Sequence, residues 1–134
     1  MLEIIEDESD AKEVISSKVR DNVILHIVNL VNNGEITLGI TLFCKGTVIA
    51  GDVIPGSEYF SSMSESCAGK SSILQKLYTD IGCQFYGKDP HPLNYIHLKN
   101  VVVKGAGSTL TPFEGGLLRM RIDEIDGHIV GRPS

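Results

Sequence analysis

The feature that most constrains this chain of 134 residues is the stretch 36–54, whose pattern predicts a two-stranded β-hairpin. In its first arm, every second residue is apolar: Ile36, Leu38, Ile40 and Leu42. A period of two places these side chains on one face, as in a half-buried strand. Gly46 suits the turn because glycine adopts positive φ at little cost. The return arm is rich in β-branched residues, which favour a packed sheet.

Length and charge limit the class of protein. A chain of this length corresponds to about one domain, because domains commonly contain roughly 100–150 residues, and we expect 1–134 to form a single domain. The net charge of -5 disfavours binding to nucleic acid or to an anionic membrane, since both need Lys and Arg. No apolar run approaches the roughly 20 residues of a membrane span. The three cysteines are an odd number without Cys-x-x-Cys spacing, which favours a reduced, cytoplasmic chain.

The segment before the hairpin is predicted to be helical. Residues 1–9 are acidic and are expected to form a flexible N-terminus, which is unlike a signal peptide. Residues 10–33 contain apolar residues at spacings of three and four, which predicts an amphipathic helix. The sequence leaves open whether this segment forms one helix or two. Gly34 follows two asparagines and is expected to end the helix in a left-handed conformation.

A helical insert is predicted after the hairpin, between the second and third strands. Residues 57–92 contain Ser57 as a candidate N-cap, a second helical run from Ser71 to Ile81, and a loop with two prolines. In the first helix, three large residues share one side: Tyr59, Phe60 and Met63.

Three further strands are predicted within residues 93–132. The first, 93–103, is expected to place Tyr95, His97, Lys99, Val101 and Val103 on one face. Residues 104–114 read as a loop, and residues 115–125 as the fourth strand. Asp126-Gly127 predicts a tight hairpin turn into a last strand at 128–132.

These elements together predict an α+β, mainly β fold. Five short antiparallel strands favour a small, partly open barrel, because closure removes exposed strand edges. The order of elements resembles the Sm-like variant of the SH3-type barrel, with an N-terminal amphipathic helix and a helical insert between strands 2 and 3. That resemblance concerns the fold and does not determine function.

Residues 64–71 differ by one residue from a phosphate-binding P-loop, because Ser64 stands where the motif requires Gly. A P-loop also follows a buried strand, whereas a helix is predicted to precede this segment. The pattern therefore favours a turn between two helices over a nucleotide site.

No catalytic residue, metal ligand or cofactor site is predicted. The histidines lack metal-ligand spacing, although His97 and His128 both fall in predicted strands and would form a spatial site if those strands were neighbours. Cys67 near Lys70 is the cysteine with the most basic setting, but it has no catalytic motif. Asp126 is explained by its turn.

An ordered series of short patterns resembles a known family. Its parts are Asn29-x-x-Asn32-x-Gly34, Leu38-x-Ile40-x-Leu42-x-x-x-Gly46-x-Val48-Ile49-x-Gly51, Glu58-Tyr59-Phe60-x-x-x-Ser64-Glu65, Tyr95-Ile96-His97-Leu98-Lys99-Asn100, and Arg119-x-x-Ile122-x-Glu124-Ile125-Asp126-Gly127-x-x-x-Gly131. This series is similar to the gas vesicle accessory proteins of the U type (GvpU-like) over about residues 21–132. The resemblance implies a non-enzymatic cytoplasmic protein that affects gas vesicle assembly or clustering. Its expected partners are gas vesicle shell or accessory proteins, or a second copy of itself.

A candidate interaction surface and an alternative function accompany this resemblance. Tyr59, Phe60 and Met63 are a candidate interaction surface, although they could equally cover the barrel. The alternative function is an Sm-like barrel that binds RNA or a small ligand. The chain departs from the Sm-like RNA-binding patterns at residues 55–59 and 114–116, which disfavours RNA.

Overall fold

A computed structural model describes residues 22–85, 94–105, 111–112 and 116–133. The predicted N-terminus 1–9, residues 10–21 of the predicted helix 10–33, and residues 86–92 of the predicted insert lie outside the described residues. The described elements, in chain order, are α2 Asn22–Asn32, β1 Leu38–Cys44, β2 Thr47–Ile54, α3 Gly56–Cys67, α4 Ser72–Phe85, β3 Tyr95–Lys104, β4 Thr111–Pro112, β5 Leu117–Arg121, the 3-10 turn η1 Ile122–Glu124 and β6 Gly127–Val130.

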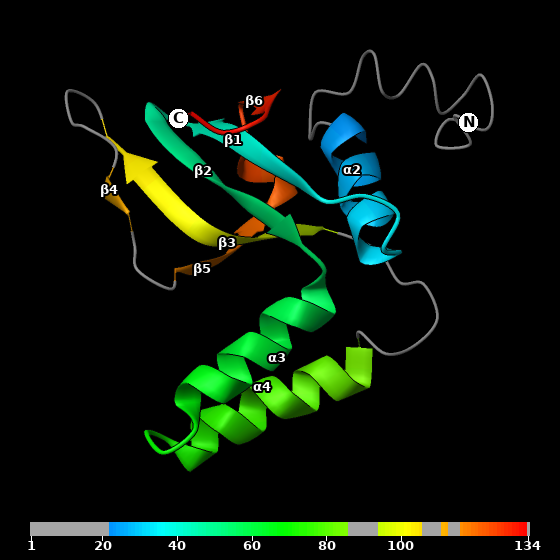
Figure 1. Ribbon diagram of the computed structural model, residues 1–134, viewed down its shortest axis with the longest axis vertical. Coiled ribbons are helices and arrows are strands. Elements are labelled where there is room, and N and C mark those ends of the chain that lie inside the picture. The colour runs from blue at the N-terminus through cyan, green and yellow to red at the C-terminus, as the bar shows by residue number, and fades with distance from the viewer. Residues whose placement is uncertain (1–21, 86–93, 106–110, 113–115, 134) are drawn as a thin grey trace.

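The strands form one antiparallel sheet. Helix α2 packs near one end of the sheet, and the α3–α4 hairpin projects away from the sheet (Figure 1). The strand order is β4-β3-β2-β1-β6, and β5 pairs with another part of β3. Since β4 and β5 contact successive parts of β3, the sheet is five strands wide. The predicted combination of helices with five antiparallel strands is confirmed. Among the described strands, β5 and β6 do not pair with each other, so the sheet is not closed into a barrel.

The predicted hairpin is confirmed in detail. Strands β1 and β2 pair from Leu38 opposite Val53 to Cys44 opposite Thr47. The two turn residues have positive φ, 49° at Lys45 and 83° at Gly46. Such a pair matches the twist of the flanking strands, which is why two-residue hairpins favour it.

Helix α2 ends where its sequence indicated. Gly34 has φ 75°, its N–H donates to the Val31 carbonyl at 3.0 Å, and the Glu35 N–H donates to the Leu30 carbonyl at 3.0 Å. This pair of bonds satisfies the last carbonyls of the helix. The main core lies between α2 and one face of the sheet; its side chains below 2% exposure include Ile24, Ile40, Leu42, Ile96, Leu98 and Ile122.

The predicted faces of β3 are correct only as far as Lys99. Asn100 has φ 54°, and the pairing of β2 with β3 shifts between Ala50 and Asp52. A β-bulge here reverses the alternation, so Val101 joins the main core instead of sharing a face with His97. Asn tolerates the left-handed conformation better than most residues, which explains its place at the bulge.

The predictions for the C-terminal third need three corrections. Residues 115–125 are not one strand, because β5 ends at Arg121 and a 3-10 turn follows. Asp126-Gly127 does not close a hairpin, because β5 and β6 lie on opposite edges of the sheet. Asp126 instead donates its N–H to the Phe43 carbonyl at 2.8 Å and accepts the Lys45 N–H at 2.7 Å. The predicted loop 104–114 contains the short strand β4.

The helical insert between β2 and β3 is confirmed, with a different start. Helix α3 begins at Gly56 with Pro55 as N-cap, so Ser57 is not the cap. Pro55 provides no side-chain cap, and the N–H of Gly56 instead donates to the Asn32 side-chain oxygen at 3.1 Å. The end of α2 therefore caps the start of α3.

Candidate interaction surface

Helices α3 and α4 pack through a small aromatic cluster. Tyr59 and Phe60 of α3 lie with ring centroids 6.5 and 6.0 Å from Tyr78 of α4. Ile81 also packs there, and Gly82 permits the close approach because a Cβ at that position would lie 3.1 Å from the Phe60 Cβ. One side of α4 is thus held against α3.

A second apolar side of α4 is left exposed. Ile73 is 81% exposed, Leu74 is 45% exposed and Leu77 is 48% exposed. Residues four apart on a helix lie one above the other, so Ile73 and Leu77 share a line on the surface. We call Ile73, Leu74 and Leu77 the α4 stripe. Lys76 and Asp80 border it and form an ion pair with an N–O distance of 2.6 Å. Clustered exposed apolar residues commonly mark a contact site.

The predicted surface residues lie beside this stripe, mostly inside the protein. Tyr59 is 7% exposed and Phe60 is 3% exposed, because both fill the space between the helices and the sheet, while Met63 is half-buried against them. Their burial shows that the two aromatic residues cover part of the sheet. The α4 stripe was not predicted from the sequence. Its spacing indicated a helix but not which apolar side would remain outside.

A second exposed apolar surface lies at strand β6. Ile129 is 57% exposed and Val130 is 61% exposed. Among the described strands, β6 pairs only with β1, and it is the last strand on this side of the sheet. Sheet edges of this kind are templates for pairing with another chain. Strand β6 and the α3–α4 hairpin lie at opposite ends of the molecule (Figure 1).

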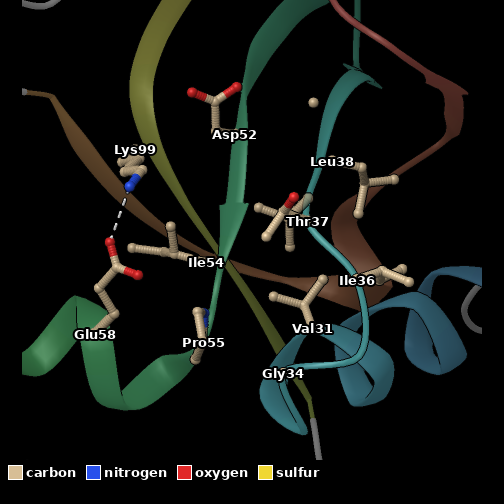
Figure 2. A pocket seen from close by; sticks show the side chains of 12 residues that line it. Val31, Gly34, Ile36, Thr37, Leu38, Asp52, Ile54, Pro55, Glu58 and Lys99 are labelled. Carbon is tan, nitrogen blue, oxygen red and sulfur yellow. Dashed lines mark hydrogen bonds and ion pairs between the residues drawn. The ribbon is translucent and has the colours of Figure 1, made fainter.

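A groove of about 460 Å³ lies where α2, the starts of β1 and α3, and the end of β2 meet (Figure 2). Apolar side chains such as Val31, Ile36 and Ile54 line it. Its charged groups are engaged within the chain. Glu58 accepts from the Lys99 ammonium at 3.1 Å, and Asp52, which also lines the groove, forms an ion pair with Arg132. The groove therefore presents an apolar wall with neutralised charges.

Comparison with known proteins gives one decisive result. A family model described as "Gas vesicle protein GvpU-like" matches residues 21–133. The chain belongs to the GvpU-like family. No curated protein matches significantly, and no solved structure does. The resemblance found in the sequence is therefore confirmed, and it identifies a protein associated with gas vesicles.

The P-loop pattern of this GvpU-like chain is a turn between helices. Residues 64–67 close α3, Gly69 has φ 77°, and α4 begins at Ser72. Helix α3, and not a strand, comes directly before the turn, so the segment lacks the strand-to-helix geometry of a phosphate cradle. The predicted interhelical turn is correct.

The hypothesis that His97 and His128 form a site is wrong. His97 lies on β3 and His128 on β6, with β2 and β1 between these strands. His97 is 3% exposed and stacks 4.7 Å from the Tyr59 ring, and burial together with nearby Arg119 lowers its pKa to about 4. Within the described residues, no group of three metal-ligating side chains gathers.

The cysteines of the GvpU-like chain lie apart on separate elements, Cys44 at the hairpin turn, Cys67 at the end of α3 and Cys83 in α4, and each is a free thiol. Among the described helices, none combines the length and the apolar character that crossing a bilayer requires.

Proposed function

We propose that this chain is a non-enzymatic cytoplasmic accessory protein that affects gas vesicle assembly or clustering through protein–protein contacts. Family membership supports the association with gas vesicles. The observation that carries the contact mechanism is the α4 stripe, where Ile73 remains 81% exposed on a helix whose other apolar side is packed. Large apolar side chains gain about 1.5–3 kcal/mol each when fully buried, which favours covering the stripe by a partner.

The presence of two apolar surfaces suits a protein that joins other particles. The α4 stripe and the β6 edge are on different elements, so one partner on each would leave the other accessible. A protein with two such contacts can link two bodies, and linkage raises the effective concentration of the second contact. We assign the β6 edge to a gas vesicle shell or accessory protein.

The residues first proposed as the surface keep a role here. Tyr59 and Phe60 hold α4 in place from within, and half-buried Met63 is the member of the set that a partner can touch directly.

We also infer that the sheet is an open form of the Sm-like variant of the SH3-type barrel. The support is its strand order, in which a short 3-10 turn carries the chain from β5 back to pair with β1. The RNA-binding and ligand-binding alternatives gain no support, because Lys99 beside the groove is already paired with Glu58.

The test is to produce gas vesicles in cells with and without this chain and to record their number and arrangement by electron microscopy. We expect wild type to change the arrangement or abundance of vesicles. Ile129→Lys on β6 and Leu77→Lys on α4 should each weaken that effect, and the exposed but remote Val23→Ser, 39% exposed in wild type, should not. Identical vesicles with and without the chain would contradict the proposal.

A further inference from the structure

The α4 stripe has the features of a surface that binds its own copy. We propose that two copies of this chain pair through their α4 helices, antiparallel, about a two-fold axis near Leu77. This inference rests on the proposed function and assigns one of its two surfaces. In a two-fold contact the same patch serves both partners, so the patch must be complementary to itself.

The apolar side chains of the α4 stripe can be complementary to themselves in this way. Helix α4 has 14 residues and is about 21 Å long at 1.5 Å per residue. With Leu77 at the axis, the Leu77 side chains of the two copies meet, and each Ile73 lies toward the C-terminal half of the other α4. The exposed side chains of the α4 stripe lie outside the cluster around Tyr78, so they can make this contact without disturbing it.

The charges beside the stripe also complement each other. Antiparallel pairing about Leu77 brings Lys76 of one copy opposite the turn that carries Asp80 of the other, twice by symmetry. Within one copy these residues already pair at 2.6 Å, but both side chains are exposed, at 76% and 56%, and Lys preceding Asp is the weaker order on a helix. Exchanging ion-pair partners between the copies therefore loses little stabilisation within each copy.

The acidic balance of the whole chain does not oppose this contact. Residues 70–85 contain Lys70 and Lys76 against Asp80 as their charged side chains, so the negative excess lies elsewhere. Three apolar side chains cover less than the 1,200–2,000 Å² of a typical stable interface, so we expect a dimer that forms only as concentration rises.

Sedimentation velocity of the purified full chain, without gas vesicles, tests the pairing. Wild type should shift from monomer to dimer with concentration, and Leu77→Lys should stay monomeric with an unchanged circular dichroism spectrum. Ile73→Glu is a second variant, since a side chain 81% exposed contributes little to the fold. Ile129→Lys on β6 is the matched control and should dimerise normally.

A charge exchange identifies the partner as a second copy in this geometry. Lys76→Asp alone and Asp80→Lys alone place like charges opposite each other in both symmetric contacts, and each should weaken dimerisation about tenfold. An equimolar mixture of the two variants should restore it, because opposite charges then face each other at both contacts.

Three results would overturn the inference: wild type that stays monomeric at every concentration, dimers that survive both stripe variants, or dimers that only the β6 variant abolishes. Because the sedimentation experiment contains no vesicles, the absence of a dimer would not contradict the proposed function. A chain that is monomeric in solution but still alters gas vesicles would contradict the dimer and support the proposed function.

Discussion

Arg132 and Asp52 form an ion pair with an N–O distance of 3.1 Å that spans strand β1 and joins the chain beyond β6 to strand β2. Between them lies Gly39, which is paired with Asp52 and has no side chain to block the crossing. Arg132 also donates to the Asn100 backbone carbonyl at 2.8 Å, and the Asn100 side-chain amide donates to the Asp52 carboxylate at 2.9 Å. The C-terminal end is thereby fastened across the sheet to the bulge in β3.

We expect Arg132→Ala and Asp52→Ala to show a coupling of about 1 kcal/mol in a double-mutant cycle of urea unfolding. Burial acts to raise the pKa of Asp52, but hydrogen bonds from Asn100 and Arg132 outweigh it and leave the pKa below its usual value. A carboxyl with a lowered pKa stabilises the fold above its unfolded pKa, and this stability is lost as pH falls through the folded value. The coupling should therefore shrink below about pH 4.

The exposed pair Lys76–Asp80 is the control for that cycle, and it should show no measurable coupling. Equal coupling in the two pairs would contradict the role given to Arg132.

Gly39→Ala should destabilise the protein by about 1–3 kcal/mol, because the new Cβ would lie 2.5 Å from the Arg132 Cγ. The atoms that the new Cβ would clash with belong to the Arg132 side chain, which can be removed by mutation. In an Arg132→Ala background, Gly39→Ala should therefore lower the stability much less. Thermal unfolding of the four proteins measures this. The same penalty in both backgrounds would show that Gly39 is needed for another reason.

Asn32→Ala should destabilise the protein by about 1 kcal/mol, because the first N–H of α3 loses its acceptor and Pro55 offers no side-chain substitute. Asn29→Ala is the matched control. Asn29 is exposed within α2, and Ala favours a helix interior. In chemical unfolding, the free energy of unfolding of Asn32→Ala should be lower than that of wild type, and that of Asn29→Ala should equal or exceed it. Reversal of that order would show that the cap contributes nothing.

Features set by neighbouring residues were predictable from the sequence. The alternation of β1, the Lys45-Gly46 turn and the end of α2 at Gly34 each depend on a few adjacent residues with strong backbone preferences. The helical insert was also recognisable. The spacing of its apolar residues indicated two helices, and a glycine lies between them.

Features set by distant contacts were not. The bulge at Asn100 depends on how β3 meets β2, and Asp126 is held by Phe43 and Lys45 from another strand. A local Asp-Gly signal was therefore outweighed by pairing with β1. The candidate surface was missed for a similar reason. The sequence shows that α4 has a wide apolar arc, but only the packing of α3 determines which part of that arc stays exposed.

His97 should make stability depend on pH between about 4 and 6.5. Burial first, and Arg119 second, lower its pKa from 6.5 to about 4, so in this range the unfolded state binds the proton that the folded state excludes. Stability is then highest above the unfolded pKa and falls as pH decreases, by about 3 kcal/mol in total.

Urea unfolding at pH 7 and pH 5 measures the effect, with His97→Phe as the variant that retains a ring beside Tyr59. The loss between these pH values should be smaller in His97→Phe than in wild type. An equal loss in both proteins would show that other groups cause it.

If this chain acts on gas vesicles through its outer surface, it should bind to them. Flotation of purified wild-type protein with isolated gas vesicles measures that binding, because gas-filled vesicles rise and carry bound protein with them. Wild type should collect in the buoyant layer in a saturable manner, and a variant combining Leu77→Lys with Ile129→Lys should remain below. A wild-type chain that stays entirely in the lower solution would contradict the proposed action on gas vesicles.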